Sequence, residues 1–127
     1  MSPAQSWIDK ASADISAADI LFASDNPPYE IICFHCQQAI EKYFKAFLDF
    51  HSIDIPRTHD LDVLLKLCLT ITDQHASINR MQIAVLTDFA VNFRYPGEYA
   101  VPDAEETQNY ITLAKQIQKF TVNLFSH

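Results

Sequence analysis

One stretch of the chain gathers most of the side chains that could do chemistry. Its polar residues recur at spacings of three and four: His35, Gln38, Lys42, Lys45 and Asp49. Residues at these spacings share one face of a helix. Gln37 and Glu41 widen the face, and we call these seven residues the polar seam. Imidazole, amide, ammonium and carboxylate groups bind phosphates or transfer protons, so the seam indicates a built-in site or a partner surface.

Three residues outside the seam are further candidates for a ligand site. Arg94 and Tyr95 lie in a connection bounded by prolines that contains the only glycine of the chain. A guanidinium can hold a phosphate bidentately, or it can pair with helix carbonyls or a nearby carboxylate. Tyr95 can stack on a base, or pack with its hydroxyl at the rim of the core. His59 can contact phosphate or carry a proton, or it can simply precede a helix start.

The two seam lysines also have two interpretations. Lys42 and Lys45 could supply a local positive charge to an anion. Glu41 and Lys45 are also four residues apart, the spacing of an ordinary helix ion pair that contributes roughly 0.2–0.5 kcal/mol. The charge pattern alone leaves both possibilities open.

Metal and cysteine chemistry have little support in the sequence. Cys33, His35 and Cys36 are close together, but a structural zinc site needs four ligands and no second Cys/His cluster is present. We therefore expect no metal and no other cofactor. The cysteines are better interpreted as small apolar residues that face neighbouring helices. No carboxylates are spaced as an acid/base pair.

The elements that position these residues are helices. The stripes of apolar residues and the prolines at 27 and 28 predict five of them, from about Pro3 to Ala23, Tyr29 to Phe50, Leu61 to Thr70, Ser77 to Val91, and Asp103 onward. Asp60 or Thr58 is the expected N-cap of the third helix. Asp103 and Glu106 have the spacing of a capping box.

The apolar positions of these helices define the expected core. They are Ile8, Ala11, Ile15, Ala18 and Phe22; Ile32, Cys36, Ile40, Tyr43, Phe44, Phe47 and Phe50; Leu61, Leu64, Leu65 and Cys68; Ile78, Val85, Leu86 and Phe89; and Tyr110, Leu113, Ile117, Phe120 and Leu124. This pattern predicts an all-α fold, an antiparallel bundle of four long helices plus one short helix. We expect residues 1–127 to form a single domain.

Composition excludes several classes of function. A single glycine in 127 residues rules out a glycine-rich phosphate loop. The net charge of −7 provides no broad basic surface, so a nucleotide or RNA would need a local positive patch. The sequence has no apolar run long enough for a membrane span and no signal pattern at its N-terminus. Three cysteines fit free thiols in a reducing compartment, and we expect a cytoplasmic protein.

Three motifs together resemble a known family. They are His35-x-Gln37-Gln38-Ala39-x-Glu41-Lys42-x-x-Lys45-Ala46-x-Leu48, His59-x-Leu61-x-x-Leu64, and Arg94-Tyr95-Pro96. In this order and spacing they are similar to the HEPN domain, named for higher eukaryotes and prokaryotes nucleotide-binding. The resemblance implies a helical bundle that usually dimerises. It also implies a site lined by the polar seam and the arginine after the fourth helix, and a frequent partnership with a minimal nucleotidyltransferase.

Some members of the family are metal-independent ribonucleases, which carry an arginine followed four to six residues later by a histidine. No histidine follows Arg94, Arg57 or Arg80 at that spacing. The resemblance therefore favours a nucleotide- or RNA-binding accessory protein that is more a binder than an enzyme. Its candidate ligand residues are Arg94, Tyr95, His59, Lys42, Lys45, Gln38 and His35. One alternative is an endoribonuclease in which His59 or Tyr99 replaces the missing histidine. Another is a structural dimerisation module.

Overall fold

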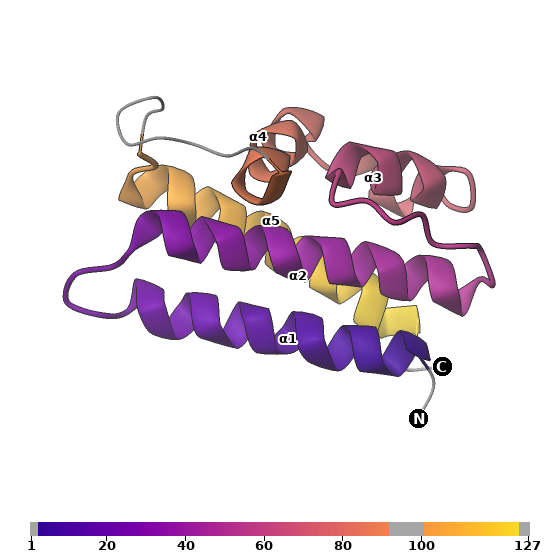
Figure 1. The fold of residues 1–127 in the computed structure, drawn as a ribbon, viewed down its shortest axis with the longest axis horizontal. Helices are drawn as coiled ribbons and strands as arrows, with labels where there is room; N and C mark the ends of the chain where they lie inside the picture. Colours follow the sequence, from indigo (N-terminus) through magenta and orange to yellow (C-terminus); the bar gives the residue numbers. More distant parts are fainter. Residues whose placement is uncertain (1–2, 92–100, 125–127) are drawn as a thin grey trace.

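The computed structural model describes residues 3–91 and 101–124, so Arg94, Tyr95 and Tyr99 lie outside the described residues. All regular structure in the described part is helical (Figure 1). The elements are α1 (Pro3–Phe22), α2 (Tyr29–Phe50), α3 (Leu61–Leu69), the short 3-10 helix η1 (Gln74–Ser77), α4 (Arg80–Val91) and α5 (Ala104–Leu124). No helix of this part is long and apolar enough to cross a membrane.

The predicted helix bounds hold for α2 and nearly so for α1, α3 and α5. The fourth helix differs, because it begins at Arg80 rather than Ser77, and Gln74–Ser77 forms η1 instead. The cause is a cap at Asn79, whose side-chain oxygen accepts the backbone N–H groups of Met81 at 3.0 Å and Gln82 at 3.2 Å. At 12 residues α4 is shorter than predicted, and the described residues contain three helices of 20 to 22 residues where four long helices were predicted.

The two neighbours of α2 run in opposite directions. Figure 1 shows α1 antiparallel to α2 across a short turn, whereas α5 lies behind α2 and runs the same way. Cys33 contacts Thr107 and Tyr43 contacts Gln118, so residue numbers rise together along α2 and α5. The predicted antiparallel arrangement is therefore wrong for this pair. From α3 to α4 the chain turns back along α2, and α5 begins beside the start of α2, so the two helices can run parallel.

Helix α2 is the centre of the bundle and packs against α1, α3, α4 and α5. The predicted apolar stripes of α1, α2, α3 and α5 are mostly buried in one core. Two predicted core residues are exposed. Val85 lies outside the buried line of α4, which is formed by Ile83, Leu86 and Thr87, and Phe50 is the last residue of α2. These corrections leave the core intact.

The predicted caps are present at two helices. Asp60 accepts the N–H of Asp62 at 2.9 Å at the start of α3. Asp103 accepts the N–H of Glu106 at 2.8 Å at the start of α5, which is one half of the predicted capping box, and the Glu106 carboxylate accepts from the Tyr110 hydroxyl. Thr58 instead accepts the N–H of Asp60. These bonds satisfy donors that have no partner within the helix, and the cap of α3 fixes the loop that carries His59.

Candidate functional site

Three of the seven residues of the polar seam are buried, and the other four are partly exposed. Gln37, Glu41 and Lys45 are only 0%, 4% and 8% exposed, although two of them carry charge. Burying a charge is unfavourable unless it is paired and hydrogen-bonded. The seam is therefore a network whose partners determine what it can do.

Glu41 is the centre of that network. One carboxylate oxygen accepts from Lys45 Nζ at 2.9 Å. The other accepts from Gln37 Nε2 at 3.2 Å and lies 2.9 Å from His59 Nδ1. Burial by itself would raise the pKa of Glu41, but the hydrogen bonds from Lys45, His59 and Gln37 together outweigh it and lower that pKa. Glu41 is therefore a carboxylate at neutral pH.

His59 contacts Glu41 through one ring nitrogen, and the rest of its side chain is exposed to solvent. Its side chain is 62% exposed although Nδ1 contacts Glu41, and Gln37 Nε2 also donates to its main-chain carbonyl at 3.3 Å. An ionised Glu41 accepts, so Nδ1 is the donor, and a neutral ring then has its lone pair on Nε2. The α2–α3 loop thus presents an oriented imidazole to solvent.

A second cluster joins the seam to α1. The carboxylate of Asp14 lies 3.0 Å from His35 Nδ1 and accepts from Lys42 Nζ at 2.6 Å. All three side chains are partly buried. One carboxylate from α1 therefore positions two of the predicted ligand residues of α2.

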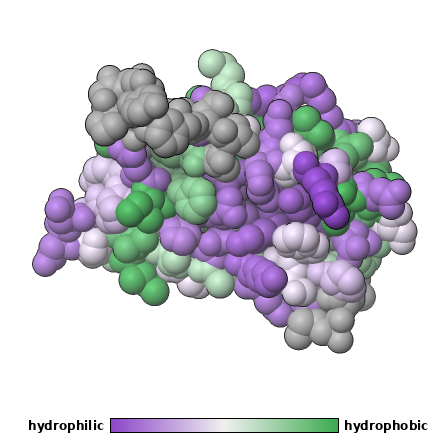
Figure 2. Space-filling model, viewed as in Figure 1, coloured by the Kyte–Doolittle hydropathy of each residue, from purple (hydrophilic) through white to green (hydrophobic). Residues whose placement is uncertain are grey.

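The two clusters together carry little net charge. Lys45 Nζ also lies 5.5 Å from the Trp7 ring centroid, a cation–π contact. Each seam lysine is engaged by a carboxylate of this chain, so Asp14, Glu41, Lys42 and Lys45 sum to zero. Figure 2 shows hydrophilic side chains across the middle of the face that α2 crosses. The seam is a polar surface rather than a preformed basic one.

The structure brings together five of the seven predicted ligand residues. His35, Gln38, Lys42 and Lys45 line α2, Gln38 Nε2 donates to Gln37 at 2.7 Å, and His59 joins from the following loop. Arg94 and Tyr95 lie outside the described residues.

Sequence reasoning missed Asp14 and the central position of Glu41. Asp14 is three residues after Ala11 and four before Ala18, both buried in α1. This spacing places the aspartate on the core-facing side of the helix, and a charged residue there was an available signal.

The cysteines have the environment that the sequence predicted. Cys33, Cys36 and Cys68 are buried and free. Burial is the main cause that raises the thiol pKa of Cys33 to about 11 and those of Cys36 and Cys68 to about 12. They are protonated, unreactive thiols at neutral pH. In the part of the chain that the structure describes, no three His, Cys, Asp or Glu side chains are placed to hold a metal ion.

Comparison with known proteins agrees with this architecture. The family model of the HEPN domain matches residues 4–124. A crystal structure described as an archaeal HEPN homologue superposes with a TM-score of 0.74, at 25% identity and with 98% of each chain covered. Among curated proteins, none matches the chain. The match extends over α1 to α5, including the polar seam and the His59 loop, and the chain belongs to the HEPN domain family.

Proposed function

We propose that this protein binds a nucleotide or RNA at the polar seam, and that binding rather than bond breaking is its main activity. The supporting observation is the buried network of Gln37, Glu41 and Lys45 at the centre of a HEPN bundle. Apolar residues of similar volume stabilise a core at least as well as a buried ion pair. Packing alone therefore does not require charged residues at these positions. Their presence favours a role in ligand binding.

Within this proposal the site residues have unequal roles. Lys42 and Lys45 already contact carboxylates at 2.6 Å and 2.9 Å, so they offer a ligand little uncompensated charge. Arg94 is the proposed principal phosphate contact because its fork is always charged. Tyr95 stacks on the base, and His35, Gln38 and His59 form the polar rim. With a net charge of −7, we expect nonspecific RNA binding to be weak at physiological salt.

The proposed assembly is a homodimer that works with a separate minimal nucleotidyltransferase. This part rests on the family resemblance. Light scattering on the purified protein tests the dimer. Co-purification with a nucleotidyltransferase encoded beside it tests the partner. A monomer that binds no such enzyme would contradict the proposed assembly. It would not bear on the proposed ligand binding, which has its own test.

Thermal unfolding with and without millimolar ATP and other nucleotides tests the binding proposal. A ligand at 100 times its Kd adds about 2.7 kcal/mol to the folded state, which raises the Tm of a domain of this size by several degrees. We expect the rise in the wild type, its loss in Arg94→Ala and its retention in Arg80→Ala. Arg80 is a matched control because its guanidinium binds Asp62 on the surface. Equal shifts in all three proteins, or none with any nucleotide or short RNA, contradict the proposal.

A second candidate function, metal-independent RNA cleavage, is favoured by the Glu41–His59 pair. The Nδ1 contact of 2.9 Å fixes the ring and leaves Nε2 as a base. In the proposed step Nε2 takes the proton of a ribose 2′-hydroxyl, and that oxygen forms a bond to the adjacent phosphorus. The P–O5′ bond breaks, and the departing O5′ takes a proton from water. The products are a 2′,3′-cyclic phosphate and a 5′-hydroxyl.

Cleavage assays in excess chelator test this second function. We expect His59→Ala to reduce the rate by roughly 10²–10⁴-fold, the usual contribution of an acid–base group, and Glu41→Gln to reduce it less. His51→Ala is the control because His51 is an exposed histidine at the end of α2. No cleavage in the wild type, or equal cleavage in His59→Ala, rejects the role of His59.

A further inference from the structure

Phosphate binding at the polar seam needs positive charge that its two lysines do not supply. Asp14 pairs with Lys42 at 2.6 Å, and Glu41 pairs with Lys45 at 2.9 Å, so these four charges cancel. Asp49, the remaining carboxylate of the seam, lies near the end of α2 and adds a negative charge. A phosphate at the seam therefore gains little from the seam residues that are charged at neutral pH.

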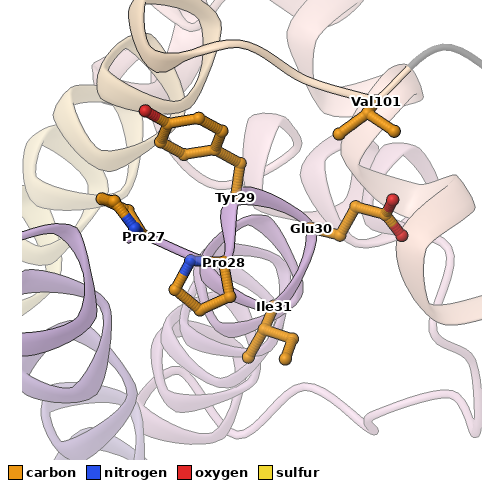
Figure 3. Close-up of a pocket in the computed structure, with 6 residues that line it drawn as sticks. All are labelled: Pro27, Pro28, Tyr29, Glu30, Ile31 and Val101. Carbon is orange, nitrogen blue, oxygen red and sulfur yellow. The ribbon is translucent and has the colours of Figure 1, made fainter. Parts of the chain in front are cut away.

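The start of α2 does not supply this charge either. A pocket of about 390 Å³ lies there, and none of the described residues that line it is cationic: Pro27, Pro28, Tyr29, Glu30, Ile31 and Val101. Figure 3 shows the side chains of Tyr29, Glu30 and Ile31 pointing away from the helix in different directions rather than toward one centre. This pocket therefore offers a phosphate no positive charge.

Two histidines at the seam can each gain a positive charge. His35 Nδ1 lies 3.0 Å from Asp14. His59 Nδ1 lies 2.9 Å from Glu41. An ionised carboxylate can only accept hydrogen bonds, so both Nδ1 atoms are donors. Neither Nε2 atom has a partner among the described residues, and the two side chains are 28% and 62% exposed. Both rings therefore have the same tautomer and are open to a ligand.

The tautomer decides what each ring can bind. When Nδ1 donates, a neutral imidazole has a lone pair on Nε2. The free oxygens of a phosphodiester are also acceptors, so a neutral ring cannot form a hydrogen bond with them. A second proton on Nε2 makes the ring both a donor and a cation. A phosphate can therefore bind to either ring only together with a proton.

Each ring shares its carboxylate with one lysine. The groups that face His35 are Asp14 of α1 and Lys42 of α2, and both bind to the same aspartate. This cluster has one carboxylate, one ammonium and one imidazole. It is therefore neutral while the ring is neutral, and it has a charge of +1 when the ring is protonated.

The cluster at His59 has the same composition. Glu41 faces the ring, and Lys45 binds the other oxygen of that carboxylate. In the α2–α3 loop itself, Arg57 and Asp60 are neighbours of opposite charge, and Asp60 is engaged as the cap of α3. Protonation of both rings therefore changes the summed charge of the two clusters from zero to +2.

We propose that the polar seam binds the phosphates of RNA in a proton-coupled manner, with His35 and His59 each taking up a proton at Nε2 when the strand binds. His35 and Glu41 are six residues apart on α2, roughly 9 Å along the helix axis. An RNA strand can therefore place one phosphate at each ring, whereas AMP has a single phosphate. The inference rests on the proposed function, since it concerns the same site, and it adds regulation by pH.

Calorimetry with a 2′-O-methyl uridine tetranucleotide tests the proton coupling. Neither uracil nor a phosphodiester titrates near neutral pH, and the methyl groups block cleavage through the 2′-hydroxyl. Titrations in two buffers of different ionisation enthalpy give the number of protons that are taken up. We expect about one to two protons per tetranucleotide at neutral pH. Binding should be at least about tenfold tighter at about pH 5.5 than at about pH 7.5.

Histidine variants assign the protons. His35→Gln and His59→Gln should each reduce the proton uptake, and the double variant should bind with an affinity that no longer depends on pH. His51→Gln is the matched control, because His51 is exposed at the end of α2 and its ring packs on Phe47 and Phe50. Nitrogen NMR should show Nε2 of both seam histidines becoming protonated when the tetranucleotide binds. Circular dichroism at both pH values confirms that each variant is folded.

The outcomes separate this inference from the proposed function. Equally tight binding at both pH values with no proton uptake overturns the proton coupling and leaves the proposed function standing. Proton uptake that persists in the double variant overturns the assignment to His35 and His59. Binding of AMP without binding of the tetranucleotide overturns the preference for RNA. No binding of the tetranucleotide or of AMP at either pH overturns both the inference and the proposed function.

Discussion

Two buried polar regions of the bundle, both against α2, are organised in opposite ways. At the seam, each carboxylate oxygen of Glu41 has a partner. On another side of α2 His75 is only 1% exposed, and neither of its ring nitrogens has a hydrogen-bond partner in the described part of the chain. Three phenylalanine rings surround it, Phe44 at 5.8 Å, Phe47 at 4.8 Å and Phe120 at 5.7 Å.

The difference shows how one core can contain both a charge and a neutral polar ring. Hydrogen bonds keep Glu41 ionised despite burial. At His75 burial acts without compensation and lowers the pKa to about 4, so the ring is neutral at physiological pH. The stability of the seam therefore depends on the hydrogen-bond partners of Glu41. The stability of the aromatic cage around His75 depends on that ring remaining neutral. Variants that remove a hydrogen-bond partner at the seam, or the titrating ring of His75, should change the free energy of unfolding in different ways.

The largest effect should come from removing the central carboxylate of the seam. Glu41→Ala leaves Lys45 buried without its 2.9 Å partner, and breaking a buried pair in this way costs about 3–5 kcal/mol of the free energy of unfolding. Urea unfolding monitored by circular dichroism measures it. The double variant Glu41→Met with Lys45→Met should recover most of the loss, because no charge is left unpaired. A double variant as unstable as the sum of the single ones contradicts the coupling.

The aromatic cage should make the protein sensitive to acid. The pKa of His75 is about 4 when folded and 6.5 as the ordinary value, so between these pH values the unfolded chain binds more protons. The free energy of unfolding therefore falls as the pH falls from 6.5 to 4, by roughly 3 kcal/mol in total. His75→Leu should abolish this part of the pH dependence, and His51→Ala should retain it. An unchanged pH profile in His75→Leu would assign the acid sensitivity to other groups.

Titration of Glu41 affects the free energy of unfolding at lower pH than titration of His75. Its stabilising contribution is fully present above its ordinary value of 4.5 and is lost as the pH falls through its lower folded pKa. The loss due to Glu41 therefore begins where that due to His75 is nearly complete. Asp62 also has a lowered pKa because of its hydrogen bond with Arg80, so the contribution of Glu41 is the difference below pH 4.5 between the stability curves of His75→Leu and of the double variant His75→Leu with Glu41→Gln.

The sequence predicted the architecture better than it predicted the site. The period of the apolar residues determined the five helices, and the bounds of α2 were correct because the prolines at 27 and 28 and a polar loop frame it. The direction of α5 relative to α2 was wrong, since helix periodicity contains no information on which helices become neighbours. The late start of α4 depended on the cap at Asn79, a local hydrogen bond competing with an otherwise helical pattern.

The site was harder because its chemistry depends on contacts between distant residues. The spacing along α2 placed Lys42 and Lys45 on one face, but not Asp14 or His59, which are 28 and 18 residues from their partners. From the sequence, Lys42 was a candidate to supply positive charge to an anion. In the structure its ammonium pairs with Asp14. The environment of His75 was not predicted at all, because a single histidine among polar residues gives no sign of a phenylalanine cage.

The smallest expected effect separates structural from ligand-binding roles within the seam. Asp14→Ala removes the partner of His35 and Lys42, and because these groups are partly exposed we expect a loss of only about 1 kcal/mol. The same change frees the Lys42 ammonium, so AMP should bind several-fold more tightly if a phosphate lies at the seam. Asp9→Ala, which removes an exposed carboxylate of α1 that contacts Gln5, is the matched control. Reduced stability with unchanged AMP affinity would mean that Lys42 only joins α1 to α2. Tighter AMP binding in Asp14→Ala but not in Asp9→Ala would mean that Asp14 neutralises the charge of a ligand-binding lysine. The seam would then be a phosphate site whose positive charge is balanced by a carboxylate of the same chain.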